Sequence, residues 1–284
     1  MNLDSPAEIR ALLSERGLAL KKRWGQNFLV NRGARERLIA VLDPRADDRV
    51  WEIGPGLGAM TESLVQRVAA LVAFEVDRGL CRYLEERFAG VPSFRLVPGD
   101  FLETWKGEMA GTGAPSRILG NLPYASASLM IADLIESGAR PRAMVFTVQK
   151  ELAERIASAP GRKSYSSFSV LCQSCFAVAP RGNLQPGSFY PAPDVVSSVI
   201  EMTPLTGAPE GRVLETLSLL LRGLFSSRRK TIRNNVAACR LGLPSEEILA
   251  AAVESGIDPS RRAEELEPAA FIRLARTLTG RANA

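Results

Sequence analysis

The clearest chemical signal in the chain is a glycine-rich turn at residues 54–58. Gly54, Gly56 and Gly58 follow a short apolar run and precede a stretch with helical periodicity. Glycine adopts positive φ angles and lets a ligand approach the backbone closely. Glu75 lies 21 positions after Gly54, at the end of the next predicted strand, where a carboxylate can accept hydrogen bonds from both hydroxyls of a ribose. Together these residues predict a site for a nucleoside cofactor.

Two cofactors are compatible with this turn. The spacing Gly54-x-Gly56-x-x-Ala59 satisfies one form of the NAD fingerprint, so a dehydrogenase stays open on the turn alone. Two further features favour S-adenosylmethionine. Asp100 follows the third predicted strand, where it can bind an adenine amine, and a polar turn at residues 121–124 ends the fourth strand. Doubly wound sheets bind their ligands at this edge.

The turn Asn121-Leu122-Pro123-Tyr124 suits methylation of an aromatic amine, whose lone pair is delocalised into the ring. Two acceptors that bond both amine hydrogens favour a pyramidal nitrogen, and the Asn121 side-chain oxygen and the Leu122 carbonyl form such a pair. Pro123 restricts the backbone of Leu122, and Tyr124 offers a flat face for stacking a base. The amine proton becomes acidic only after methylation, so this chemistry requires no histidine base.

The chain contains no histidine, which excludes Ser-His-Asp and Cys-His triads and histidine-ligated metals. We therefore expect no metal ion. The four cysteines do not form a disulfide framework in a chain of 284 residues. Cys172-x-x-Cys175 lies in the apolar run Ser169–Val178 and is interpreted as a pair of buried thiols in a reducing cytoplasm.

The first half of the chain alternates short apolar runs with amphipathic stretches, which predicts a parallel sheet with crossover helices. The predicted strands are Val50–Ile53, Leu71–Glu75, Phe94–Pro98, Ile118–Gly120 and Ala143–Val148. The predicted helices are Ala59–Val68, Gly79–Phe88, Ser126–Glu136 and Lys150–Ala157. A late strand, Val195–Thr203, is expected to be antiparallel near the sheet edge. The expected fold is a Rossmann-like, doubly wound α/β sheet.

The C-terminal part of the chain is predicted to be helical. Thr203–Gly211 is rich in turn formers and is interpreted as a linker. Helices are predicted beyond it at Val213–Phe225, Arg229–Cys239, Ser245–Ser255 and Pro268–Leu278. We therefore expect a catalytic α/β domain over residues 1–204 and a small helical domain over residues 205–284.

Basic residues gather in two acid-poor clusters. Lysine and arginine number 36 against 31 acidic residues. One cluster surrounds residues 25–29 and contains Lys21, Lys22, Arg23, Arg32, Arg35 and Arg37. The other lies within Arg222–Arg240 and includes Arg228, Arg229, Lys230 and Arg233. Beside a base-modifying site, two such clusters predict a surface that binds RNA phosphates.

Composition predicts a soluble protein of the cytoplasm. Hydrophobic residues make up 46% and charged residues 24% of the chain, which is typical of globular proteins. No apolar stretch approaches the length of a membrane span. Met1–Leu20 lacks the apolar core of a signal peptide.

The chain resembles the ribosomal RNA adenine dimethyltransferases over residues from about Lys21 to Phe271. The joint order of the motifs carries the resemblance, since each motif alone is unspecific. They are Gly25-Gln26-Asn27-Phe28-Leu29, Glu52-Ile53-Gly54-Pro55-Gly56-Leu57-Gly58, Phe74-Glu75-Val76-Asp77, Gly99-Asp100-Phe101, Asn121-Leu122-Pro123-Tyr124, Val148-Gln149-Lys150-Glu151, Phe189-Tyr190-Pro191-Ala192-Pro193-Asp194-Val195 and Arg228-Arg229-Lys230-Thr231-Ile232-Arg233-Asn234-Asn235.

The resemblance implies N6,N6-dimethylation of two adjacent adenosines near the 3′ end of 16S ribosomal RNA, by a monomer that uses S-adenosylmethionine and acts on the small ribosomal subunit. It implies cofactor contacts from Asn27, Leu29, Gly54, Gly56, Glu75, Asp100 and Asn121. It implies a catalytic turn made of Asn121, Leu122, Pro123 and Tyr124, and target-adenine contacts from Asn121 and Tyr124. The chain departs from the family after Tyr124, where Ala125-Ser126-Ala127-Ser128 replaces the usual Asn and β-branched residue, and Ser126 or Ser128 is expected to cap the next helix.

Three alternatives remain open. The first is a large-subunit methyltransferase of the macrolide-resistance type, which the intact Gly-Pro-Gly-Leu-Gly turn and Leu122 disfavour, because that branch more often has isoleucine there. The second is a non-catalytic RNA-binding or transcription factor on the same fold, and the complete set of cofactor and amine-binding residues argues against it. The third is a dehydrogenase, for which the glycine turn is the sole support.

Overall fold

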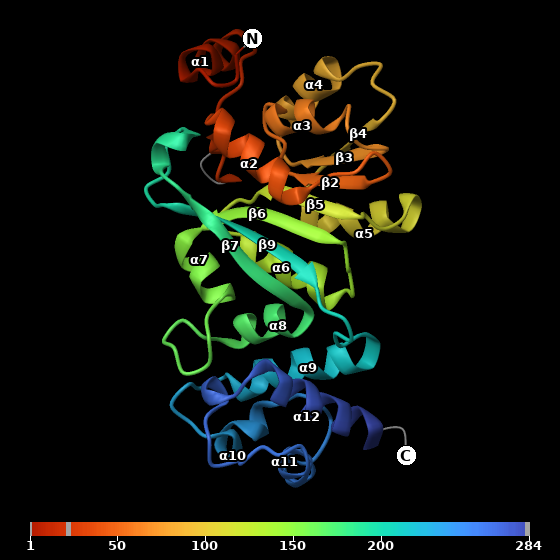
Figure 1. Ribbon diagram of the computed structural model, residues 1–284, viewed down its shortest axis with the longest axis vertical. Coiled ribbons are helices and arrows are strands. Elements are labelled where there is room, and N and C mark those ends of the chain that lie inside the picture. The colour runs from red at the N-terminus through yellow and green to blue at the C-terminus, as the bar shows by residue number, and fades with distance from the viewer. Residues whose placement is uncertain (1, 21–23, 282–284) are drawn as a thin grey trace. The chain divides into compact units, whose positions relative to one another are not determined.

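The computed structural model describes residues 2–20 and 24–281, and the chain divides into two compact units (Figure 1). The first unit comprises Met1–Ile131, Arg140–Ala153 and Ala179–Thr203. The second comprises Ala132–Ala139, Glu154–Val178 and Pro204–Ala284. The division of the chain between residues 204 and 205 stays a prediction, because two earlier segments also group with the second unit.

The described part of the first unit is built around a mixed sheet with the strand order β4-β3-β2-β5-β6-β9-β7. Strands β4, β3, β2, β5 and β6 are parallel, and β9 runs antiparallel to β6. The doubly wound α/β fold and its antiparallel late strand are therefore confirmed. The bounds are β2 Arg49–Ile53, β3 Ala70–Glu75, β4 Phe94–Pro98, β5 Arg117–Asn121, β6 Ala143–Gln149, β7 Phe176–Leu184 and β9 Ser197–Pro204.

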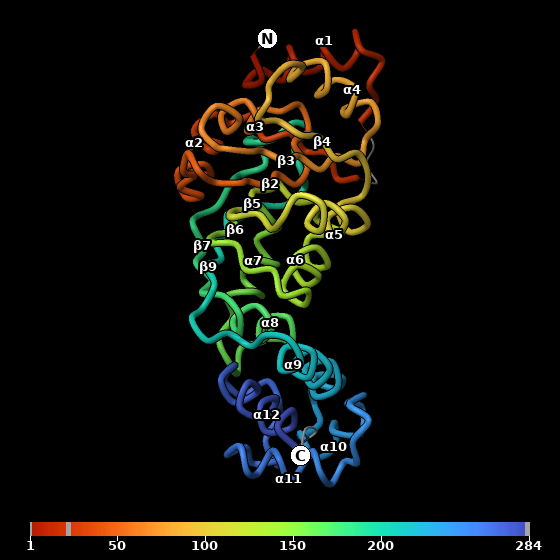
Figure 2. Tube along the Cα trace, turned by 90° about the vertical axis from the view of Figure 1, so that its right-hand side faces the viewer, coloured from red at the N-terminus to blue at the C-terminus, as the bar shows by residue number. Residues whose placement is uncertain are grey.

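Helices cover both faces of this sheet, as a parallel sheet requires. Helices α2 and α3 lie on one side of it and α5 lies on the other (Figure 2). Short polar side chains begin several of these helices: Asn31 caps α2, Asp77 caps α4 and Asp100 caps α5, each by accepting a hydrogen bond from a first-turn N–H group. The bounds are α2 Arg32–Leu42, α3 Ala59–Leu64, α4 Arg78–Arg87, α5 Phe101–Thr112, α6 Ala127–Glu136 and α7 Lys150–Ile156.

An aromatic cluster joins β2, β3 and α5 in the core. The rings of Trp51 and Phe74 have centroids 5.0 Å apart, and those of Phe74 and Phe101 are 5.1 Å apart, both edge to face. Trp105 stacks on Phe101 from the next turn of α5. Edge-to-face aromatic pairs contribute about 0.5–1.5 kcal/mol each beyond their burial. The cluster therefore gives the carboxyl ends of β2 and β3 a rigid support.

The described part of the second unit is helical, and the only strand residues in it are the first residues of β7 and the last residue of β9. Helices α9 and α12 pack on each other and on α8. Cys172 and Cys175 are buried on α8 as thiols outside any disulfide, so their interpretation as core thiols is confirmed. The bounds are α8 Ser167–Cys175, α9 Gly211–Leu224, α10 Ile232–Asn235, α11 Ser245–Glu254 and α12 Pro268–Arg281.

Two predicted helices are longer than the observed ones. The helix predicted to reach Val68 ends at Leu64, because the chain turns there into β3 and the Val65 carbonyl accepts a hydrogen bond from Ser93. The helix predicted over Arg229–Cys239 is wrong: residues 228–230 form a turn and a bend, α10 begins only at Ile232, and a short 3₁₀ helix follows it. Asn235 explains this, since its amide donates to the carbonyls of Leu224 and Ser227 and ties the segment back to α9.

Several elements escaped prediction, namely α1 (Pro6–Glu15), α2, α5, α8, β7 and two short strands, β1 (Phe28–Leu29) and β8 (Phe189–Tyr190), which pair with each other. In the described ranges, no helix has the length and apolar character needed to cross a membrane. The same residues hold no group of three or more metal-ligating side chains.

Candidate active site

A cavity of about 510 Å³ lies in the first unit, at the carboxyl ends of β2, β3, β4 and β5. This is the edge where the strand order reverses between β2 and β5, the usual ligand position in such sheets. All of the residues predicted to contact the cofactor line this cavity: Asn27, Leu29, Gly54, Gly56, Glu75, Asp100 and Asn121. Pro123 and Tyr124 line it as well, whereas the Leu122 side chain is buried in the core.

The glycine turn forms one wall of the cavity through close backbone packing. Gly54, Gly56 and Gly58 all have positive φ angles, of 70°, 57° and 77°. A Cβ atom on Gly56 would lie 2.8 Å from the ring of Phe28. Side chains larger than glycine are therefore disfavoured here by conformation, and at Gly56 and Gly58 by space as well, because a Cβ atom on Gly58 would lie 2.8 Å from the ring of Phe88.

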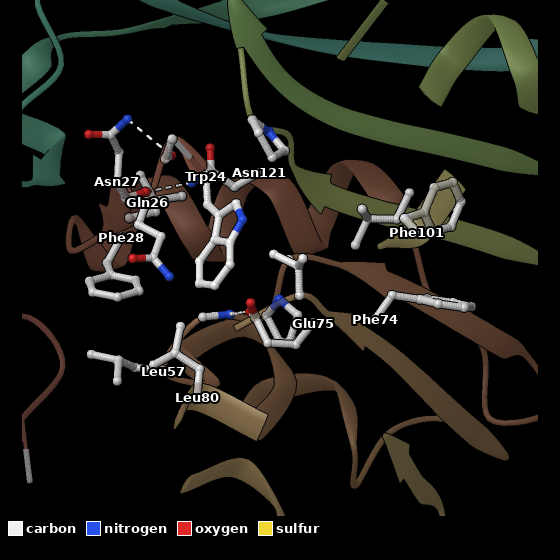
Figure 3. A pocket seen from close by; sticks show the side chains of 18 of the residues that line it. Trp24, Gln26, Asn27, Phe28, Leu57, Phe74, Glu75, Leu80, Phe101 and Asn121 are labelled. Carbon is white, nitrogen blue, oxygen red and sulfur yellow. Dashed lines mark hydrogen bonds between the residues drawn. The ribbon is translucent and has the colours of Figure 1, made fainter. Parts of the chain in front are cut away.

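Glu75 projects from the end of β3 toward the middle of the cavity (Figure 3). Its two carboxylate oxygens accept hydrogen bonds from the backbone N–H of Asp77 (2.9 Å) and of Gly56 (3.2 Å). Burial raises the pKa of Glu75 to about 7, although these two hydrogen bonds favour the charged form. The carboxylate is therefore held in one orientation beside the glycine turn.

Glu52 is a second buried carboxyl group near the turn, and the sequence analysis did not identify it as a site residue. Its side chain is fully buried on β2 and accepts a hydrogen bond from the Thr61 hydroxyl of α3 (2.6 Å). This contact joins the strand before the glycine turn to the helix after it. Burial, with a smaller contribution from the negative charge of Glu75, raises the pKa of Glu52 to about 7, although the hydrogen bond from Thr61 favours the charged form.

We predict that Glu52→Gln flattens the dependence of stability on pH. Burial raises the pKa of Glu52 from 4.5 to about 7, so the folded protein retains a proton that the unfolded chain releases in this window. The free energy of unfolding therefore falls as pH rises through it, by roughly 3 kcal/mol for this one group. Glutamine does not titrate and lacks this contribution.

Urea unfolding at about pH 5 and about pH 8 measures the effect. The loss of stability between these two pH values should be smaller in Glu52→Gln than in the wild type by about 2 kcal/mol. Glu62→Gln is the matched control, because Glu62 lies on the exposed side of α3 and pairs with Arg87. An equal loss in the wild type and in Glu52→Gln would contradict the assignment.

The turn after β5 places Asn121 and Tyr124 at the cavity. The Asn121 amide nitrogen donates to the backbone carbonyl of Asn27 (2.7 Å), which leaves the side-chain oxygen to accept a hydrogen bond from a ligand. The Leu122 N–H donates to the Thr147 carbonyl of β6 (3.0 Å) and anchors the turn to the sheet. The Tyr124 hydroxyl lies 2.6 Å from the hydroxyl of Ser197 on β9.

Two of the four residues that depart from the family pattern lie at the same cavity. Ala125 and Ser126 line it, and α6 begins directly after Ser126. The Ser126 carbonyl accepts a hydrogen bond from the N–H of Met130 (2.9 Å), so Ser126 occupies the position before the first helical residue. Its hydroxyl is directed to the Met130 sulfur, 4.0 Å away.

Residues 24–29, which come before α2 in the sequence, form another wall of the cavity. The Trp24 indole projects into the cavity between Gln26 and Glu75 (Figure 3). The Gln26 amide donates to the carboxylate of Asp77 (3.2 Å). Arg35 donates to the carbonyl of Leu29 (2.8 Å). These contacts fasten the segment to the neighbouring helices.

The first basic cluster is only partly the surface that the sequence predicts. Arg35 is buried, pairs with Asp4 and holds Leu29, so its assignment to a phosphate-binding surface is wrong. Arg32 pairs with Glu36 on the same helix. Lys21, Lys22 and Arg23 lie outside the described residues.

The cavity fits S-adenosylmethionine in several respects. It has a buried carboxylate for a ribose, a backbone turn that permits close approach, and an acid at the next strand end. Its apolar walls include the side chains of Phe28, Leu57, Phe74, Leu80 and Phe101. The α5 cap uses one Asp100 oxygen, which accepts from the N–H of Leu102 (2.9 Å), and this fixes the carboxylate at the cavity wall.

Comparison with known proteins agrees with this site. The model of the ribosomal RNA adenine dimethylase family matches residues 17–279. The chain belongs to this family. One relative, from Treponema pallidum, is named ribosomal RNA small subunit methyltransferase A. It is 41% identical to this chain, and the match covers 98% of this chain and 97% of the relative. A relative of the same name in Treponema denticola is 38% identical, with 96% and 94% of the two chains covered.

The fold of this dimethylase family member also resembles a solved structure. The dimethyladenosine transferase of Plasmodium falciparum has a TM-score of 0.75 to this chain, and 90% of this chain and 98% of that one are covered. The two sequences are 22% identical, so this likeness shows the fold alone. It extends beyond the sheet into the C-terminal helices, because the matched region exceeds the first unit.

The basic residues of the second cluster are exposed, but two of them are engaged by carboxylates of the same unit. Arg228 donates to the Glu264 carboxylate (2.6 Å) and to the carbonyl of Lys163, which ties it to its own unit. Arg222 likewise pairs with Glu136 (2.7 Å). The other three predicted RNA-binding residues, Arg229, Lys230 and Arg233, are exposed in the turn before α10 and in the first turn of that helix.

Proposed function

We propose that this protein dimethylates N6 of two adjacent adenosines near the 3′ end of small-subunit ribosomal RNA, with S-adenosylmethionine as the methyl donor. The observation that carries the proposal is that one cavity combines a ribose-binding carboxylate with the turn Asn121–Tyr124. Membership of the ribosomal RNA adenine dimethylase family supports it. The names of the two Treponema relatives favour the small subunit over the large-subunit alternative.

The cofactor is held by residues on three strand ends and on the N-terminal segment. Glu75 accepts hydrogen bonds from the ribose hydroxyls, and Asp100 binds the adenine amine. Gly54 and Gly56 supply a backbone wall, while Asn27 and Leu29 close the opposite side. When bound, S-adenosylmethionine supplies an electrophilic methyl group on a sulfonium, so the protein has no strong electrophile to generate.

The chain's own residues orient the target amine. The Asn121 side-chain oxygen and the Leu122 carbonyl accept hydrogen bonds from the two N–H groups of the amine. These bonds direct the nitrogen lone pair away from the ring. The Tyr124 ring stacks on the adenine, which contributes roughly 1–3 kcal/mol in comparable contacts. Both acceptors remain after one transfer, and a monomethylated amine still carries one hydrogen. The same site therefore adds the second methyl group.

The test is methylation of purified small ribosomal subunits from a strain that lacks these methyl groups. Incubation with the protein and S-adenosylmethionine should produce stops at two adjacent adenosines in primer extension of the small-subunit RNA. Large subunits treated in the same way should show none. Stops in the large-subunit RNA alone would favour the macrolide-resistance type, and no stops in either would favour a non-catalytic factor.

The basic cluster supports RNA binding, because phosphate contacts position a nucleic acid without reading its bases. Arg229, Lys230 and Arg233 are the exposed candidates, while Arg228 stabilises the fold through Glu264. We further propose that the enzyme acts as a monomer in the cytoplasm, where small ribosomal subunits are its substrate.

Replacing Arg229 and Lys230 together by alanine should weaken binding of small subunits. The slope of log affinity against log salt concentration should decrease by about one unit for each lost phosphate contact, while cofactor affinity stays unchanged. Filter binding of small subunits across a salt series measures the subunit affinity and its slope, and calorimetric titration measures the cofactor affinity. Arg281→Ala, at a residue of α12 that pairs with Glu254, is the control. An unaltered slope in the double variant would identify the cluster as an ordinary solvated surface.

A further inference from the structure

Tyr124 is held at its hydroxyl end by a residue that is distant in the sequence. Its hydroxyl lies 2.6 Å from the Ser197 hydroxyl, and Ser197 is fully buried in β9. Tyr124 itself is only partly buried, because its ring lines the cavity. Burial raises the pKa of the Tyr124 phenol, and the hydrogen bond to Ser197 lowers it.

The register of the sheet explains why these two residues meet. Asn121 on β5 pairs with Thr147 on β6, and two residues further along β6, Gln149 pairs with Ser197. Ser197 is therefore displaced from the Asn121 row in the direction in which β5 leads into the turn. Tyr124 follows Asn121 by three residues in that same direction. The two hydroxyls are brought together by backbone hydrogen bonding across three strands.

We propose that Ser197 is a positioning residue for methyl transfer, which fixes the orientation of the Tyr124 ring on which the target adenine stacks. This inference rests on the proposed function. The first side-chain torsion of tyrosine has three staggered wells, so backbone position alone does not fix where the long axis of the ring points. The hydroxyl oxygen lies on that axis, so the hydrogen bond to Ser197 fixes the direction of the axis and, with it, the place of the ring in the cavity. Since transfer depends strongly on alignment of the amine, the orientation of the stacking ring affects the rate.

The next residue in β9 provides a matched control. Ser198 is also buried, but adjacent side chains of a strand point to opposite faces of the sheet. The Ser198 hydroxyl donates to the side-chain oxygen of Asn183 on β7 (2.6 Å), away from the turn. Ser197→Ala and Ser198→Ala therefore remove the same group from adjacent buried positions, and only the first contacts Tyr124.

Single-turnover methylation of small subunits tests the proposal. Ser197→Ala should lower the methyl-transfer rate about fivefold to tenfold, the range expected for one lost hydrogen bond. Tyr124→Phe removes the same hydrogen bond from the other side and should have a similar effect. The double variant should be no slower than the slower single variant, because both changes remove one interaction. Cofactor affinity should stay at the wild-type value in all three, and Ser198→Ala should transfer methyl groups at the wild-type rate.

A spectroscopic measurement separates positioning from general damage to the sheet. The chain has four tyrosines, so the ring Cζ resonances of ¹³C-tyrosine-labelled protein are few, and Tyr124→Phe identifies that of Tyr124 by its absence. Ser197→Ala should shift the Tyr124 resonance and leave the other three in place. Ser198→Ala should leave the Tyr124 resonance unchanged.

The outcomes distinguish this inference from the proposed function. A wild-type protein that does not methylate small subunits would overturn the proposed function. An active wild type with Ser197→Ala at the same rate, or with rate losses that multiply in the double variant, would overturn the positioning role alone. A Tyr124 resonance that does not move in Ser197→Ala would do so as well.

Discussion

Replacement of Asn121 by alanine should lower the rate of methyl transfer by about a hundredfold or more, because misplacing a reacting group by about 1 Å has an effect of that order. The Asn121 amide nitrogen is engaged by the Asn27 carbonyl, so its side-chain oxygen is the atom that we propose holds the target amine. Cofactor affinity should change far less, since Glu75, Asp100 and the glycine turn remain. Single-turnover kinetics and calorimetric titration separate the two effects.

Asn183→Ala is a suitable control for this variant, because Asn183 lies on β7 and contacts Ser198 rather than the cavity. It should transfer methyl groups at the wild-type rate. Tyr124→Ala should also be severe because the stacking face is lost, whereas Tyr124→Phe keeps that face. Normal turnover by Asn121→Ala would remove the amide oxygen from the mechanism.

Replacement of Glu75 should weaken binding of S-adenosylmethionine. A charged acceptor of hydrogen bonds contributes about 1.5–3 kcal/mol, so Glu75→Ala should reduce affinity by about tenfold to a hundredfold. Isothermal calorimetry measures this directly. Glu62→Gln, on the exposed side of α3, should bind the cofactor like the wild type. Unchanged affinity in Glu75→Ala would exclude the carboxylate from the site.

The pKa of Glu75 adds a pH dependence to this prediction. Burial raises the pKa to about 7, so the carboxyl group of the free enzyme is mostly protonated below that pH. The ionised form is the better acceptor for two ribose hydroxyls, and binding below about pH 7 must therefore release a proton. Affinity should rise with pH up to about 7 and level off above it. Glu75→Gln should lack this dependence.

The parts of the site that follow directly from local sequence were predictable. The glycine turn, Glu75 and Asn121 each stand next to a strand end, and the carboxyl ends of neighbouring parallel strands meet at one edge. The structure brings all three to one cavity, while their roles in binding remain predictions.

The contacts that fasten these residues were not predictable, because they depend on register and on partners distant in the sequence. Thr61 reaches Glu52 across the glycine turn, and Ser197 meets Tyr124 only because β9 pairs with β6 in one register. Arg35 was misassigned for a related reason. Its charge indicated an exposed phosphate contact, whereas folding buries it between Asp4 and the Leu29 carbonyl.

The helices too divide into those that follow from local sequence and those that depend on contacts distant in the sequence. Those with a clear apolar periodicity, such as α9 and α12, were found close to their true bounds. The segment around Asn235 has helical periodicity too, but three backbone carbonyls, those of Leu224, Ser227 and Lys230, lie within reach of its side-chain amide. That tertiary interaction overrides local preference and restricts α10 to Ile232–Asn235.

The most direct test of the central claim is mass spectrometry of nucleosides from small ribosomal subunits incubated with this protein and S-adenosylmethionine. One site that dimethylates adenine should produce N6-methyladenosine first and N6,N6-dimethyladenosine later, with the first species consumed as the second accumulates. Asn121→Ala should slow the appearance of both. A wild-type protein that stops at one methyl group, or that leaves the adenosines of the subunit unmodified, would contradict this account.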